Sequence, residues 1–105
     1  MGFKDLIAED VRLAILQFLS EGGYSQNDSI LNDLLRRTGR MIPHDKTRSE
    51  LAWLREQGLI GVEDIYDTLV ATITIRGLDV ANGLATVPGV KRPAPKKQGS
   101  SWLEP

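Results

Sequence analysis

The chain has 105 residues, of which 41% are hydrophobic and 26% charged, as is typical of one globular domain with a single modest core. It has no cysteine and one histidine, His44, which excludes a disulfide framework and a thiolate metal site. The first residues are acidic and amphipathic, unlike a signal peptide, and no apolar run approaches the roughly 20 residues that span a bilayer. We therefore expect a cytoplasmic protein that binds no metal, cofactor or membrane.

The net charge of −1 conceals an uneven distribution. Residues 1–86 carry nine Lys and Arg against thirteen Asp and Glu, a balance of −4, while residues 87–105 carry four against one, a balance of +3. Within the acidic part, thirteen consecutive positions contain a basic cluster and only one acid, Asp45; the cluster consists of Arg36, Arg37, Arg40, Lys46 and Arg48. A local excess of this kind is a candidate contact for a polyanion.

The first helix is predicted over residues 4–19, because Ile7, Val11, Ala14 and Phe18 recur at helical spacing. Further leucines widen its apolar arc beyond one face: Leu6, Leu13, Leu16 and Leu19. A helix with so wide an apolar arc packs against two neighbours. The core of the chain supplies one neighbour, and we expect a second copy to supply the other, which gives a homodimer through this helix.

A second helix is predicted to follow the Gly22-Gly23 break and to reach about Arg37. Ser25, with Asp28 three residues later, matches a capping box at its start. A third helix is expected from about Pro43 to Gly58.

Two strands are predicted next, at residues 59–65 and 68–75, joined by a tight turn at Tyr66-Asp67. The second strand alternates, with Leu69, Ala71, Ile73 and Ile75 on its buried face. A short last helix covers residues 78–84. The predicted order of helix, helix, helix, strand, strand, helix is an α+β winged helix-turn-helix.

From Val87 onward Pro, Gly, Ser and Lys dominate, and such a composition cannot bury enough apolar surface to fold alone. We therefore divide the chain into a winged-helix domain, residues 1–86, and a basic, Pro-rich tail, residues 87–105. Trp102 and Leu103 are the apolar exception in this tail and a candidate docking motif for a partner.

Residues 47–60, TRSELAWLREQGLI, resemble the recognition helix and first wing strand of ArsR- and MarR-like winged helices. Residues 72–81, TITIRGLDVA, look like the second wing strand and last helix, joined through a turn with Thr74 and Gly77. Over residues 3–93 the chain is similar to small winged-helix proteins of Mu-like prophages, chiefly through the opening FKDLIAEDVRLAIL and the closing VPGVKRP. The resemblance implies a phage-encoded, DNA-associated protein. The Cys or His clusters of metal-sensing ArsR proteins have no counterpart here.

The leading hypothesis is a transcriptional regulator that binds double-stranded DNA through the third helix. The six candidate contacts divide into base contacts and phosphate contacts: Lys46, Arg48 and Ser49 for bases, and Arg36, Arg37 and Arg40 for phosphates. The alternative for these basic residues is a solvated helix end, where arginine also complements the helix dipole.

The alternative hypothesis is a protein-interaction module on the same scaffold. Glu63, Asp64 and Asp67 crowd the hairpin turn without any base, and a phosphate backbone would repel them. Neither hypothesis is enzymatic, because no Ser, His and Asp set, carboxylate pair or Gly-rich phosphate loop stands out from the sequence.

Overall fold

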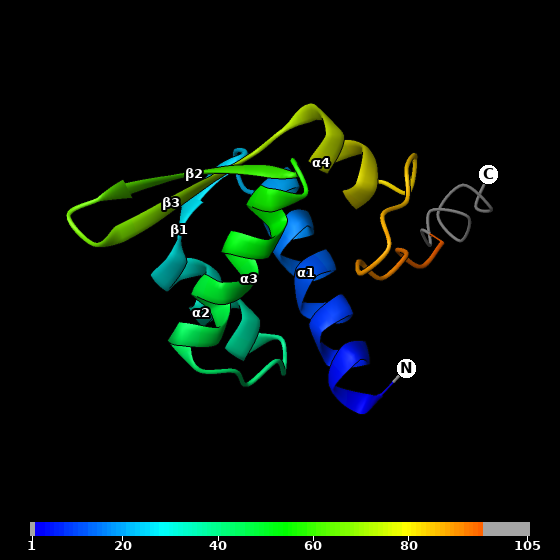
Figure 1. Ribbon diagram of the computed structural model, residues 1–105, viewed down its shortest axis with the longest axis horizontal. Coiled ribbons are helices and arrows are strands. Elements are labelled where there is room, and N and C mark those ends of the chain that lie inside the picture. The colour runs from blue at the N-terminus through cyan, green and yellow to red at the C-terminus, as the bar shows by residue number, and fades with distance from the viewer. Residues whose placement is uncertain (1, 96–105) are drawn as a thin grey trace, which may run out of the picture.

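Four helices and a three-stranded antiparallel sheet make up residues 2–95, the part of the chain that this computed structural model describes (Figure 1). The elements follow in the order α1 (Phe3–Glu21), β1 (Ser25–Asn27), α2 (Asp28–Arg37), α3 (His44–Glu56), β2 (Ile60–Ile65), β3 (Thr68–Ile73) and α4 (Ile75–Ala81). The predicted α+β class is confirmed. Trp102 and Leu103 lie outside the described residues.

Strand β1 is absent from the predicted order. Ser25 lies opposite Thr72 of β3, with their hydroxyl oxygens 3.0 Å apart, and does not cap α2. The cap is Asn27, whose Oδ1 accepts a hydrogen bond from the backbone of Ile30 at 2.8 Å. The predicted capping box at Ser25 is therefore wrong. Three polar residues are too few to show strand periodicity, and this strand exists because β3 offers a free edge, which gives the sheet order β1-β3-β2.

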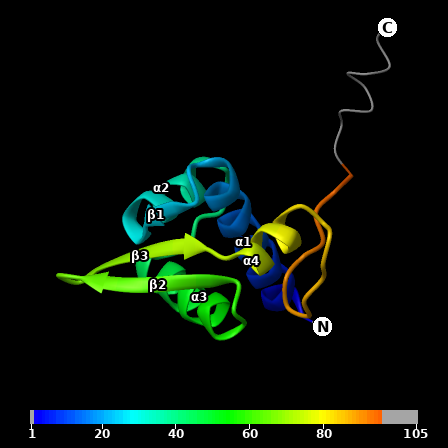
Figure 2. The same ribbon diagram turned by 90° about the horizontal axis from the view of Figure 1, so that it is seen from above.

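The β2–β3 hairpin forms as predicted and projects beyond the helices (Figures 1 and 2). Its last pair is Ile65 with Thr68, so Tyr66 and Asp67 form a two-residue turn. Both have positive φ, 51° and 68°, the conformation of a type I′ turn, in which glycine or asparagine is more usual. The backbone N–H of Asp67 donates to the carboxylate of Asp64 at 3.0 Å, which supports the turn locally.

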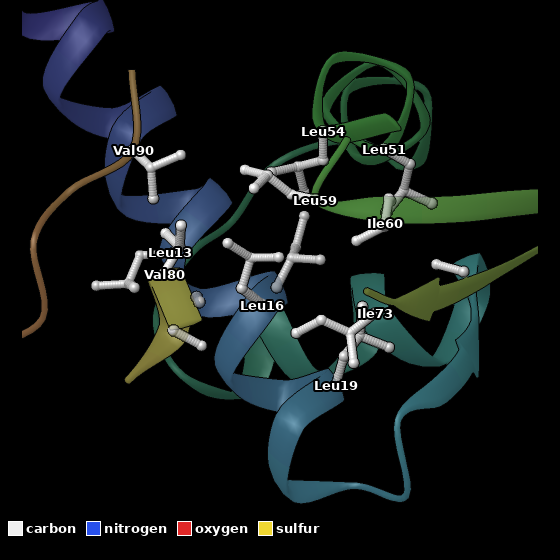
Figure 3. Packing of buried hydrophobic residues seen from close by; sticks show 14 of the residues in the cluster. Leu13, Leu16, Leu19, Leu51, Leu54, Leu59, Ile60, Ile73, Val80 and Val90 are labelled. Carbon is white, nitrogen blue, oxygen red and sulfur yellow. The ribbon is translucent and has the colours of Figure 1, made fainter. Parts of the chain in front are cut away.

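Helix α1 is covered on several sides by the chain itself, since it packs against α2, α3, α4 and β3 (Figure 3). Leu13 is 6% exposed and Leu16 is fully buried, so both belong to the core. The wide apolar arc at the middle of α1 therefore requires no second copy of the chain, contrary to the argument from sequence. The exposed large apolar residues of this helix are Phe3, Leu6 and Ile7, all in its first two turns.

Helix α4 begins three residues earlier than predicted, at Ile75. Thr74 caps it by accepting a hydrogen bond from the backbone of Gly77 at 3.0 Å. Ile75, predicted on the buried face of the strand, is 80% exposed because the chain has already turned into the helix. A side chain at Gly77 would overlap the backbone carbonyl of Leu59, so the predicted turn requires glycine for close packing.

The segment after α4, residues 85–95, is called here the C-terminal arm. Val87 and Val90 are buried in the core, and the backbone N–H of Lys91 donates to the carbonyl of Glu9 at 3.2 Å. The packed body therefore extends past residue 86, where we expected the tail to begin. The composition of the arm prevents it from folding alone but not from packing on a helix that is already formed.

Candidate binding surface

The basic cluster predicted from the sequence is largely neutralised within the chain. Four of its five members pair with carboxylates: Arg37 with Asp33 at 3.1 Å, Arg40 with Asp10 at 2.7 Å, Lys46 with Glu50 at 3.2 Å and Arg48 with Asp28 at 3.1 Å. Arg36 has no ion pair within residues 2–95. The sixth candidate, Ser49, donates its hydroxyl to the backbone carbonyl of Asp45 at 3.1 Å.

The first group, the Asp28 cluster, joins α2, α3 and the tip of the hairpin. Asp28 is 2% exposed and lies within 3.0 Å of His44 Nε2 and 3.1 Å of Arg48 Nε. The same guanidinium donates to the carbonyl of Asp67 at 3.1 Å. A buried carboxylate is tolerated only when it is paired and hydrogen-bonded. Arg48 therefore has a structural task that occupies much of its donor capacity.

The second group, the Glu50 cluster, joins α1, α3 and the C-terminal arm. Glu50 is 2% exposed and is paired with Arg12 at 2.6 Å and with Lys46 at 3.2 Å. The guanidinium of Arg12 also stacks on Trp53, 3.9 Å from the ring centre, and donates to the carbonyl of Gly89 at 3.0 Å. Gly89 has φ +96°, and a Cβ there would lie 2.6 Å from the Trp53 ring. Trp53 is thus a packing residue that joins α3 to the C-terminal arm.

The third group, the Asp10 cluster, lies where α1, the α2–α3 loop and the C-terminal arm meet. Arg40 contacts both oxygens of Asp10, at 2.7 and 3.3 Å, and Lys91 Nζ is 3.4 Å away. The hydrogen bond from Arg40 lowers the pKa of Asp10 below its ordinary value of 3.8, against the opposing effect of partial burial.

Four residues of these clusters were not predicted from the sequence: Asp10, Arg12, Asp28 and Glu50. Two of them, Glu50 and Arg12, could have been recognised from the sequence pattern. Glu50 follows Thr47 by three residues and precedes Leu54 by four, so it shares the helical face of two buried residues. Arg12 lies between Val11 and Leu13 in an apolar stretch. A charged residue on a buried stripe requires a partner of opposite charge, and this requirement explains much of the basic cluster.

One exposed row of α3 carries acids and no base. The exposed residues at helical spacing are Asp45, Ser49, Ala52 and Glu56, two acids without a base, and Arg48 and Arg55 lie at the side of this row. The adjacent hairpin exposes Glu63, Asp64 and Asp67, with Tyr66 98% exposed at the turn. We call this surface the acidic face; it consists of Asp45, Ser49, Ala52, Glu56, Glu63, Asp64 and Asp67. Together, α3 and the hairpin present an anionic surface.

The comparison with known proteins places the chain in a phage family. It is 45% identical over 93 residues to the uncharacterized protein gp26 of Escherichia phage Mu, a match that covers 89% of this chain and 97% of gp26. The chain belongs to the family of Mu gp26. An uncharacterized protein of Haemophilus influenzae (strain ATCC 51907 / DSM 11121 / KW20 / Rd) is 49% identical over 79 residues, 74% of this chain and 78% of that protein.

The expected relation to Mu-like phage proteins is therefore confirmed, whereas the winged-helix assignment is not carried by these matches. No family model and no solved structure matches the chain. Within residues 2–95, no group of three His, Asp or Glu residues could hold a metal ion. None of the helices described is both long and apolar enough to cross a membrane.

Proposed function

We propose that this member of the gp26 family is a non-enzymatic binding protein built on a winged helix-turn-helix scaffold. In this assignment α2 and α3 form the helix pair and the β2–β3 hairpin is the wing. The element order α-β-α-α-β-β-α, the antiparallel sheet order β1-β3-β2 and the tight turn at the wing tip support it. The scaffold presents the outer side of α3 together with the wing to a ligand.

We infer that the ligand of this surface is a basic region of another protein. The observation that carries this inference is the acidic face, where the exposed row of α3 has two acids and no base. Of the two bases beside this row, Arg48 is held by Asp28 and by the carbonyl of Asp67, whereas Arg55 is exposed at the C-terminal end of α3. A phosphate backbone brought to this face would be repelled, whereas Lys and Arg side chains would be attracted and steered toward it.

Two labelled probes test the proposal against each other: a Lys- and Arg-rich peptide and a random-sequence DNA duplex. The full-length protein at low salt is expected to bind the peptide and not the duplex. Replacing Asp45, Glu63 and Asp67 by Lys should abolish peptide binding and create duplex binding, because the charge of the acidic face changes from −5 to +1. Glu21→Lys, which reverses an exposed acid at the end of α1, is the control and should change neither. Strong duplex binding by the unaltered protein, with no binding of the peptide, would reject the inference.

Duplex DNA is the second candidate ligand, favoured by three exposed members of the basic cluster. Arg36 and Arg37 are exposed near the end of α2, and Lys46 is 52% exposed despite its pair with Glu50. Since the other two members are held by carboxylates, fewer phosphates would be neutralised than the sequence suggests. With these three contacts, log affinity should fall against log salt with a slope of about −3, whereas five free bases would give about −4.

The salt slope therefore distinguishes DNA binding through the exposed bases alone from DNA binding through all five bases of the cluster. Arg36→Ala should reduce the slope by about one if the exposed arginines contact phosphate. Arg40→Ala is the informative contrast, because it removes the closer of the two partners of Asp10 and should lower stability more than it changes the slope. A slope that Arg36→Ala leaves unchanged would remove this residue from the contact.

A further inference from the structure

The first two turns of α1 stand at the edge of the body (Figure 1). Their large apolar side chains are exposed. Phe3, Ile7, Val11 and Ala14 lie on one helical stripe, spaced three or four residues apart. Val11 and Ala14 are each 2% exposed, whereas Phe3 is 77% and Ile7 is 41% exposed. The stripe that fills the core thus continues onto a part of the helix that residues 2–95 leave uncovered.

The α2–α3 loop extends this apolar surface. It contributes Met41, which is 68% exposed, and Ile42, which is half-buried. Between the loop and α1 lies an open hollow of about 340 Å³, lined by Leu6, Ile7, Asp10 and residues 39–42. We call Phe3, Leu6, Ile7, Met41 and Ile42 the α1–loop surface.

We propose that the α1–loop surface is the contact between two copies of this chain, related by a two-fold axis. Such an axis requires one patch that fits its own copy. The surface meets this requirement because exposed side chains of α1 lie next to a recess against the loop. The axis would place Leu6 of each copy in the recess of the other.

The exposed apolar area of the α1–loop surface is of the size expected for contact with a second copy of the chain. Phe3, Leu6, Ile7 and Met41 are 77%, 53%, 41% and 68% exposed, which amounts to roughly 360–600 Å² if each side chain presents the 150–250 Å² of a large aromatic one. This is about half of the roughly 800 Å² that each partner buries in a standard interface, a share suited to its apolar centre. The charges around this surface have both signs, Lys4 with Asp5 and Glu9, so they would not repel a second copy of the chain.

Sedimentation equilibrium of the full-length chain tests the proposal. The expected mass is twice the 11.6 kDa of one chain. Leu6→Glu should weaken association on the order of a hundredfold or more, because each copy would bury an unpaired charge. The circular dichroism spectrum should stay the same, since Leu6 is 53% exposed. Ile75→Glu is the matched control, because Ile75 is 80% exposed at the start of α4 and should leave the dimer intact.

A chain that remains monomeric at its highest soluble concentration overturns the proposal, as does a dimer that Ile75→Glu weakens as much as Leu6→Glu. If Leu6→Glu alters folding, Met41→Glu in the loop provides the same test from outside the helix. If the protein is monomeric, residues 96–105 of the same chain are the other candidate occupant of the α1–loop surface. In that case Trp102→Ser should uncover the surface and raise the binding of a hydrophobic dye. The α1–loop surface shares no residue with the acidic face, so either proposal can fail without the other.

Discussion

Removing Arg12 should destabilise the protein far more than removing an ordinary surface arginine. Its guanidinium pairs with buried Glu50, stacks on Trp53 and donates to the carbonyl of Gly89. Arg12→Met keeps most of the side-chain volume but leaves the 2% exposed carboxylate with one partner, Lys46. The effect on the free energy of unfolding therefore measures what the Glu50 cluster contributes.

The expected magnitude is about 3 kcal/mol. Breaking a buried ion pair by removing one partner typically costs about 3–5 kcal/mol, and loss of the stacking on Trp53 adds roughly 0.5–2 kcal/mol. Lys46 remains beside the carboxylate and offsets part of this loss, although its own side chain is 52% exposed. A change of about 3 kcal/mol is large against the roughly 5–15 kcal/mol by which domains are stable.

Urea unfolding followed by circular dichroism gives the free energy for each variant. Arg12→Met combined with Glu50→Met should recover most of the loss, to within about 1 kcal/mol of the unaltered protein, because no buried charge then lacks a partner. Arg76→Met is the control, since Arg76 is exposed and has no ion pair in the described part of the chain. A cost below about 1 kcal/mol for Arg12→Met, or single effects that simply add in the double variant, would refute the reasoning.

Three further outcomes follow from the contacts described above. Because Arg40 holds the pKa of Asp10 below its ordinary value of 3.8, the stability from this carboxylate is present above that value and is lost as pH falls below it; Asp10→Asn should flatten the acid side of a plot of urea midpoint against pH, and an unchanged slope would contradict the assignment. Gly77→Ala should cost about 2–4 kcal/mol in thermal unfolding, because its Cβ would overlap the carbonyl of Leu59, whereas Gly61→Ala, where a Cβ meets nothing within 4 Å, should cost much less. Gly89→Ala should loosen the C-terminal arm and expose Trp53, seen as faster amide exchange near residue 90 and red-shifted emission; unchanged exchange would mean that the arm tolerates the side chain.

The longer elements of the fold were predictable from sequence because each has a local signal. Helical spacing located α1 and α3, and alternation between two turn residues located the β2–β3 hairpin. The ends of α4 and the strand β1 were not predictable in the same way. Thr74 ends a strand by capping a helix, and β1 exists only because β3 lies beside it, so both depend on tertiary packing.

The candidate site shows the same limit more sharply. The sequence located the basic cluster correctly along the chain, but two of its members pair with distant acids: Arg40 with Asp10, 30 positions away, and Arg48 with Asp28, 20 positions away. A linear count of charges cannot show that a base is committed to a buried carboxylate. The acidic hairpin turn, in contrast, was evident from sequence because its three acids, Glu63, Asp64 and Asp67, lie within five positions of one another.

The contacts between α1 and the C-terminal arm have a consequence for how the chain reaches its native state. The bonds from Lys91 to Asp10 and from Arg12 to Gly89 join residues 81 and 77 positions apart. During synthesis the N-terminal helix emerges first, and its apolar and charged partners in the arm emerge last. Contacts that close so long a loop form slowly relative to local ones. Until the arm has left the ribosome, Arg12 and Asp10 of α1 lack part of their native contacts. Nascent chains of this protein should therefore be most vulnerable to misassociation just before synthesis of the arm is complete.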